Sequence, residues 1–275
     1  MSLAINTNIA SLIAQQNLAV SSSQLKVSVQ RLSSGFRVNS SADDAAGLAR
    51  ADQLKGQSRM IQASMRNIND GVSAMEISDK AGEQITNIVT RMSELAASSA
   101  QGTLDSGTRS YYSSEYDKLL SEIDRIANTT EFGGFKLLNG STSALTMYIG
   151  FKNTANDQLS VSLMALTAAT GLGLVTGLLA TQTGALSAID TISTALKAIN
   201  DARAVYGAST NRLSAALSNL QVTFTNYQAA ESRIRDADFA YETAQYTKNQ
   251  IMVQAGTSVL AQANTLPQSA LSLLR

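Results

Sequence analysis

The segment from Ile189 to Ile234 repeats an apolar residue at every third or fourth position. The stripe consists of Ile189, Ile192, Leu196, Ile199, Tyr206, Leu213, Leu217, Leu220, Phe224, Tyr227 and Ile234. Only Arg203, Thr210 and Glu231 interrupt it. Its spacing averages about 3.5 residues, which is the period of a left-handed coiled coil. A helix of this length cannot bury a narrow stripe against itself, so it needs partner helices of similar length.

Other stripes of the same period can supply those partners. One consists of Leu54, Ile61, Met65, Ile68, Val72 and Met75 and then, after a slip of three residues, of Ile85, Ile88, Met92 and Leu95. Another consists of Tyr112, Tyr116, Leu119, Ile123 and Ile126. The pattern predicts heptad helices over roughly 44–100, 110–128 and 187–235. The only proline, Pro267, lies near the end and interrupts none of them.

The middle of the chain lacks the heptad pattern and contains turn and strand signals instead. Phe132-Gly133-Gly134-Phe135 is typical of a turn, and 147–151 and 159–163 resemble the two strands of a hairpin. A glycine-punctuated stretch follows, which we interpret as a surface excursion at the tip of a helix bundle. The expected fold is therefore mainly α, with long antiparallel heptad helices forming a coiled-coil rod and a small β-hairpin region at about 131–185.

The composition argues against most enzyme chemistry. The chain has no histidine and no cysteine, so it lacks the commonest general base, the commonest zinc ligand and any disulfide. Acidic residues do not cluster, and the glycines at 171–184 do not form a phosphate-binding motif. We interpret 104–107 as a turn and Ser40 or Ser41, with Asp43 and Asp44, as a helix start. We predict no catalytic, cofactor or metal site.

Both ends of the chain are amphipathic and nearly uncharged. Residues 1–42 contain no acidic residue, and 249–274 contain no charged residue. A mitochondrial transit peptide would also be amphipathic and acid-poor, but a helix that packs on another helix is the simpler interpretation of the first segment. The C-terminal segment is too polar for a membrane span. A net charge of zero favours neither nucleic acid nor an anionic membrane as a partner.

The terminal stripes predict self-assembly. Pairing the two ends with each other would leave much uncharged and apolar surface, which usually marks an interaction site. We therefore expect many copies to bury one another's ends, and we expect the free ends to be loose and to need a chaperone. The positions assigned to these assembly seams are Ile5, Ile9, Leu12, Leu32, Met252, Val259, Leu266 and Leu273.

Specific motifs at both ends are similar to those of bacterial flagellin. Near the start stand Arg31-Leu32-Ser33-Ser34-Gly35 and Asp43-Asp44-Ala45-Ala46-Gly47, and Ser232-Arg233-Ile234 comes later. The longest match is Gln254-Ala255-Gly256-Thr257-Ser258-Val259-Leu260-Ala261-Gln262-Ala263-Asn264. The resemblance covers roughly 1–140 and 187–275, and the middle is too short for large outer variable domains.

The resemblance implies a motility filament subunit that is exported unfolded by the flagellar type III apparatus. Residues 1–42 and 236–275 would form an inner coiled-coil domain, and 43–235 would form the rod-like domain. The implied partners are other copies of the chain, an export chaperone at the C-terminal segment, and the filament cap and hook-filament junction proteins. The implied location is the extracellular filament, with no membrane insertion.

The resemblance also suggests a surface read by a Toll-like receptor of animal innate immunity. The matching positions are Arg91, Glu94, Leu95 and Glu115. The alternative interpretation is that Arg91 and Glu94 are solvated helix charges and that Leu95 belongs to a packing stripe.

Three other classes compete with a flagellin. A hook-associated junction protein shares paired terminal helices but usually lacks the full 254–264 run and has a larger middle. A helical receptor with signalling coiled coils would need a membrane span or a ligand domain, and the sequence contains neither. An enzyme is the weakest alternative, because the chain has no histidine, no cysteine, no clustered carboxylates and no phosphate-binding loop.

Overall fold

The structure, a computed structural model, describes residues 7–272, with side chains described as far as residue 265. Its helices are α1 (Ile9–Ser34), α2 (Ala45–Ser99), α3 (Ser106–Thr129), α4 (Gln182–Arg235) and α5 (Phe239–Ser272). Two small antiparallel sheets pair β1 (Glu131–Phe132) with β2 (Phe135–Lys136) and β3 (Ala144–Tyr148) with β4 (Gln158–Ser162). Short 3-10 turns, η1 (Ala155–Asp157) and η2 (Leu178–Ala180), complete the order. The prediction of a mainly α, coiled-coil fold with a hairpin region is confirmed.

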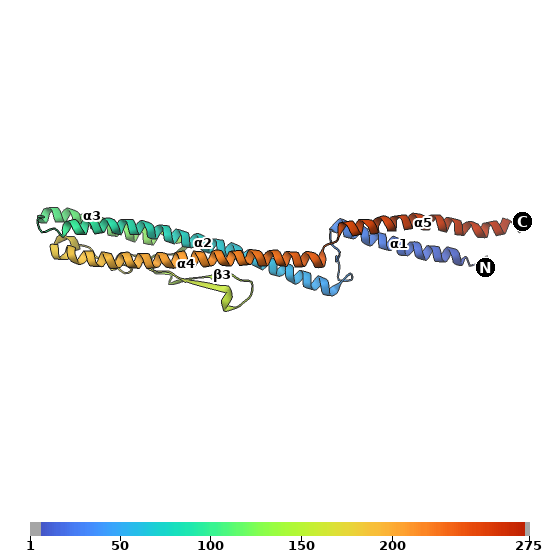
Figure 1. Ribbon diagram of the computed structural model, residues 1–275, viewed down its shortest axis with the longest axis horizontal. Helices are drawn as coiled ribbons and strands as arrows, with labels where there is room; N and C mark the ends of the chain where they lie inside the picture. The colour runs from blue at the N-terminus through green and yellow to red at the C-terminus, as the bar shows by residue number, and fades with distance from the viewer. Residues whose placement is uncertain (1–6, 273–275) are drawn as a thin grey trace. The chain divides into compact units, whose positions relative to one another are not determined.

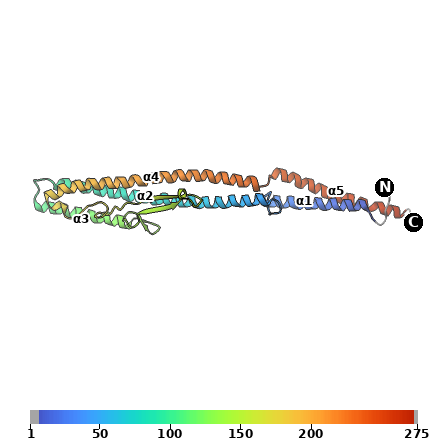
Figure 2. The same ribbon diagram turned by 90° about the horizontal axis from the view of Figure 1, so that it is seen from below.

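The chain divides into two compact units. One unit contains residues 1–58 and 225–275, and the other contains 59–224. In the second unit, α2, α3 and α4 lie alongside one another, and both small sheets lie beside them (Figures 1 and 2). In the first unit, α1 and α5 pack together, as both views show. The expected packing of the N-terminal helix on another helix is thus confirmed.

The buried face of α4 in the second unit is a heptad stripe of alternating large and small side chains. It consists of Ala185, Ala188, Ile192, Ala195, Ile199, Ala202, Tyr206, Ser209, Leu213 and Leu220. The stripe predicted from the sequence contains the same large residues. At other positions it names the residue that follows a small side chain buried in the structure. Leu196, for example, is only half-buried, whereas Ala195 is fully buried. Alanine and serine at the contact let neighbouring backbones approach closely. A pattern drawn through large apolar residues does not include these small ones.

The predicted three-residue slip in the second stripe is wrong. The buried positions of α2 in the second unit continue the three-and-four alternation without a break through Ile61, Ser64, Ile68, Gly71, Met75, Ser78, Gly82, Ile85, Val89, Met92, Ala96 and Ser99. The slip in the apolar pattern arises because Ser78 and Gly82 occupy buried positions. Ser78 satisfies its hydroxyl within the helix by donating to the Ala74 carbonyl over 2.8 Å. A Cβ at position 82 would lie 3.1 Å from Cγ of Arg203, so the small residue makes room for that side chain.

The predicted hairpin is confirmed with a shift in position, and the predicted glycine turn joins a second, shorter strand pair. β3 pairs with β4 from Ala144 opposite Ser162 to Tyr148 opposite Gln158, so its first strand begins three residues earlier than predicted. β1 and β2 are joined by Gly133 and Gly134, whose φ angles of 58° and 85° suit a tight hairpin turn.

The segment from 163 to 180 is not the surface excursion that the glycines suggested. Its leucines pack into the second unit, with Leu166 and Leu179 fully buried. Two carboxylates of α3 also hold its backbone. Asp124 accepts from the Ala168 N–H over 2.8 Å, and Asp117 accepts from the Gly177 N–H over 3.1 Å.

A buried tyrosine makes the second unit sensitive to alkaline pH. Tyr116 of α3 is fully buried, and its hydroxyl has no hydrogen-bond partner within the described residues. Burial raises the pKa of Tyr116 to about 12, whereas a tyrosine in an unfolded chain titrates at about 10. The contribution of the neutral Tyr116 hydroxyl to the pH dependence of stability is fully present below about pH 10. Between about pH 10 and 12 the native state holds more protons than the unfolded state, so the free energy of unfolding falls as pH rises.

We expect Tyr116→Phe to reduce this alkaline loss. At neutral pH the free energy of unfolding should stay the same or rise by about 1 kcal/mol, because an unpaired hydroxyl is no longer buried. Urea unfolding at pH 8 and pH 11 measures both effects, with Tyr111→Phe as the control at an exposed tyrosine of the same helix. An alkaline loss equal to that of the parent would contradict the assignment.

Candidate assembly surface of the terminal helices

Side-chain caps fix where the terminal helices begin. Asn8 accepts a hydrogen bond from the Ser11 N–H at the start of α1, and its amide donates to the Ala263 carbonyl of α5 over 2.8 Å. Asp238 accepts from the Ala240 and Tyr241 N–H groups at the start of α5. Gly35, at φ 74°, ends α1 in the left-handed conformation that favours glycine.

Backbone hydrogen bonds join the end of α1 to the short segment that runs from the end of α4 to α5. The Gly35 carbonyl accepts from the Ala237 N–H over 2.9 Å, and the Arg37 N–H donates to the Arg235 carbonyl over 2.7 Å. The Arg235 guanidinium also lies 4.5 Å from the centre of the Phe36 ring. These contacts hold α1 and α5 antiparallel where the pair begins.

The start of α2 is capped differently from the prediction. Asp44, rather than a serine, accepts from the Gly47 N–H over 2.8 Å. Asp43 closes the preceding loop by accepting from the N–H groups of Ser40 and Asn39. The hydrogen bond from the Ser40 backbone, followed by that from Asn39, lowers the pKa of Asp43.

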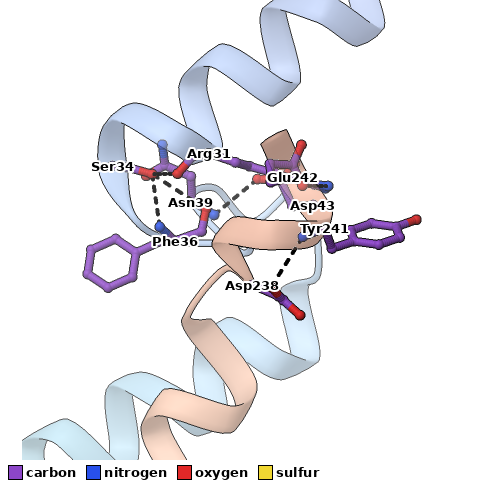
Figure 3. A network of polar contacts seen from close by, with 8 residues as sticks. All are labelled: Arg31, Ser34, Phe36, Asn39, Asp43, Asp238, Tyr241 and Glu242. Carbon is purple, nitrogen blue, oxygen red and sulfur yellow. Dashed lines mark hydrogen bonds and ion pairs between the residues drawn. The ribbon is translucent and has the colours of Figure 1, made fainter. Parts of the chain in front are cut away.

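The contact between α1 and α5 is made mostly of small and polar side chains. On α1 the buried residues are Ser11, Ala14, Ser21 and Ser28. On α5 they are Glu242, Asn249 and Ala263. Glu242 faces Arg31 across the pair, with 3.7 Å between its Oε2 and Arg31 Nη1 (Figure 3). The helices therefore pair through a contact that buries few large apolar groups.

Many of the large apolar side chains of both helices remain exposed. On α1 they include Ile9 (65% exposed), Leu12 (59%), Ile13 (54%) and Val20 (52%). On α5 they include Ile251 (59%), Met252 (50%) and Val259 (56%). Exposed apolar side chains gathered along one pair of helices are typical of an interaction site. We call these seven residues the terminal apolar surface.

The predicted seam positions fall into three groups. Ile9, Leu12, Met252 and Val259 belong to the terminal apolar surface, and Leu32 is half-buried in the pair. Ile5 and Leu273 lie outside the described residues, as does the side chain of Leu266. The internal contact of α5 follows Val253, Gly256 and Leu260, one residue after the stripe that the sequence suggested. The sequence signal for this register is the glycine at 256. In the structure it lies close to Leu18, and a Cβ at 256 would lie 3.2 Å from Leu18 Cδ1.

The four residues of the suggested receptor motif come together in the second unit. Arg91 donates to Glu94 over 2.8 Å and to Glu115 of α3 over 3.1 Å. The hydrogen bond to Glu94, followed by that to Glu115, raises the pKa of Arg91. Leu95 is only 3% exposed, so it packs inside the bundle beneath the charged side chains.

In the part of the chain that the structure describes, no group of three or more acidic side chains lies close enough to hold a metal ion. Across the same residues, no helix has both the length and the apolar character needed to cross a membrane.

Comparison with known proteins gives the same family for both ends of the chain. The model of the bacterial flagellin N-terminal helical region matches residues 5–143, and that of the C-terminal helical region matches 189–274. The flagellin of Halalkalibacterium halodurans is 36% identical over 271 residues, covering 98% of this chain and 99% of that one. Flagellin A of Vibrio cholerae is 33% identical, with both chains fully covered.

Solved structures agree with this result. A crystal structure of Bacillus cereus flagellin aligns with a TM-score of 0.51 at 29% identity, covering 56% of this chain and 88% of that one. A putative flagellar hook-associated protein from Vibrio parahaemolyticus aligns with a TM-score of 0.61 at 13% identity, covering 70% of this chain and all of that one. The second likeness shows a shared fold alone, whereas the flagellin relatives match in sequence along nearly the whole length. The chain belongs to the bacterial flagellin family.

Proposed function

We propose that the chain is the structural subunit of a bacterial flagellar filament and polymerises through its terminal helices. The observation that carries this proposal is the terminal apolar surface, which the contact between α1 and α5 leaves exposed. Burying the exposed half of one such side chain contributes about 1 kcal/mol. Seven of them on each subunit, repeated along a polymer, give an adequate driving force for assembly.

In the filament, 1–42 and 236–275 would form the inner coiled-coil domain, and 43–235 would form the surrounding rod-like domain. The subunit would leave the cell unfolded through the flagellar type III apparatus and join the extracellular filament at its distal tip. An export chaperone would cover the C-terminal segment, since exposed apolar helices associate indiscriminately. The cap and hook-filament junction proteins would contact the filament ends. The role is structural and involves no catalysis or cofactor.

Seeded polymerisation tests the function directly. Purified chain should elongate short filament seeds, and negative-stain microscopy should show smooth filaments of flagellar width. Persistent monomers after every seeding attempt would contradict the proposal.

We further propose that the charged cluster of Arg91, Glu94 and Glu115 is read by the Toll-like receptor that recognises flagellin. Arg91 bridges two carboxylates on two helices, so it presents a fixed pattern of charge. The buried Leu95 would support the helix rather than touch the receptor.

Arg91→Ala should lower receptor activation by the monomer at least about tenfold, because one charge-assisted contact contributes about 1.5–3 kcal/mol. A cell-based receptor reporter measures the response. Arg125→Ala is the matched control, since Arg125 forms a similar exposed ion pair with Glu122 on α3. Equal activation by the Arg91→Ala monomer and the parent would overturn the assignment.

A further inference from the structure

The bend at Asn139 and Gly140 in the second unit is closed by two hydrogen bonds to one side-chain oxygen. The side-chain oxygen of Asn139 accepts from the Ser141 N–H over 3.0 Å and from the Ser141 hydroxyl over 2.6 Å. Within the described residues, the N–H of Gly140 has no hydrogen-bond partner. Asn139 is also the only one of the chain's asparagines that is followed by glycine.

Glycine is required at position 140 for two independent reasons. Its φ angle is 81°, which side-chain-bearing residues rarely adopt. A Cβ there would also lie 2.9 Å from the Cβ of Ala165. The fold therefore places a residue without a side chain directly after an asparagine, where the following backbone nitrogen is least shielded.

We propose that Asn139 is a site of self-modification, at which the Gly140 backbone nitrogen displaces the side-chain amide. A bond forms between the Gly140 nitrogen and Cγ of Asn139, and the bond from Cγ to Nδ2 breaks. The Gly140 nitrogen loses its proton, and Nδ2 leaves as ammonia. The cyclic imide that results is opened by water at either carbonyl, which gives aspartate or isoaspartate at 139. No oxidation or reduction takes place.

The hydrogen bonds of Ser141 favour this reaction. Attack on Cγ places negative charge on the side-chain oxygen of Asn139. The Ser141 N–H and hydroxyl already point at that oxygen, so they stabilise the charge as donors in an oxyanion hole do. Gly140 and Ser141 are exposed, so water reaches the imide.

The two products have different structural consequences. Aspartate at 139 keeps the oxygen that accepts from Ser141, so the turn persists with one added negative charge. Isoaspartate lengthens the main chain by one carbon directly after Leu138. Leu138 is fully buried, and its carbonyl accepts from the Leu166 N–H over 2.7 Å. Formation of isoaspartate should therefore loosen the segment that packs over α3.

Incubating the full-length chain at pH 8 and 37 °C tests the proposal. Trypsin cleaves after Lys136 and Lys152 and releases residues 137–152, in which mass spectrometry measures conversion of Asn139. We expect the folded chain to convert faster than a synthetic peptide of the same residues. Asn153, which is exposed and followed by threonine, serves as the internal reference and should stay unconverted over the same time.

Variants of Ser141 separate the role of the fold from that of the sequence. Ser141→Ala should slow conversion in the folded chain about fivefold, the effect of one hydrogen bond, without changing the rate in the peptide. Ser141→Thr retains the hydroxyl and should retain the rate, and circular dichroism verifies that both variants fold. A folded chain that converts no faster than the peptide, or a rate unaffected by Ser141→Ala, would overturn the proposal.

Discussion

Removing residues 249–275 should abolish filament formation and leave a soluble, helical monomer. The deletion takes away most of α5, including Asn249 and Ala263 from its contact with α1 and the three α5 residues of the terminal apolar surface. An isolated helix of the length of α1 is marginal in water, so α1 should unfold when its partner is gone. The second unit, 59–224, has its own buried heptad stripes and should remain folded.

Three measurements define this outcome. Microscopy after seeding should show no filaments, and circular dichroism should show a helix loss that corresponds to α1 and α5 only. Limited trypsin digestion should cut rapidly at Lys26, Arg31 and Arg37 while the second unit resists. Filament growth by the truncated chain would refute a role of the terminal helices in assembly.

Placing charge on the terminal apolar surface should block assembly without unfolding the subunit. Met252 and Val259 are 50% and 56% exposed, so Met252→Glu with Val259→Glu removes little internal packing. Once buried between subunits, each unpaired carboxylate would cost about 2 kcal/mol or more. Together they should raise the concentration needed for filament growth about a thousandfold.

The control keeps the same positions apolar. Met252→Leu with Val259→Ile retains volume and should polymerise at nearly the parental concentration. Sedimentation of seeded samples over a range of concentrations gives the threshold for each variant, and thermal unfolding of the monomers verifies that the subunits are equally stable. If the glutamate variant polymerised at the parental threshold, these side chains could not lie in a buried contact between copies.

The sequence determined the class of fold because a three-and-four repeat from Ile189 to Ile234 is compatible with few structures other than packed helices. It also indicated one hairpin from two short apolar runs and a turn at 132–135, and it placed apolar stripes on both nearly uncharged ends. Motifs at the two ends indicated the flagellin family.

Only the tertiary structure decided which side chains enter each contact. Ser78 and Gly82 are buried at positions where the pattern of large apolar residues is interrupted, and Ala195 is buried in place of its neighbour Leu196. The reason is that close approach of two backbones selects small residues as strongly as burial selects large ones. The same effect at Gly256 moves the internal contact of α5 by one residue and leaves Met252 and Val259 on the outside. A periodic sequence defines a stripe, but the face that its own chain covers depends on how closely the partner helix can approach.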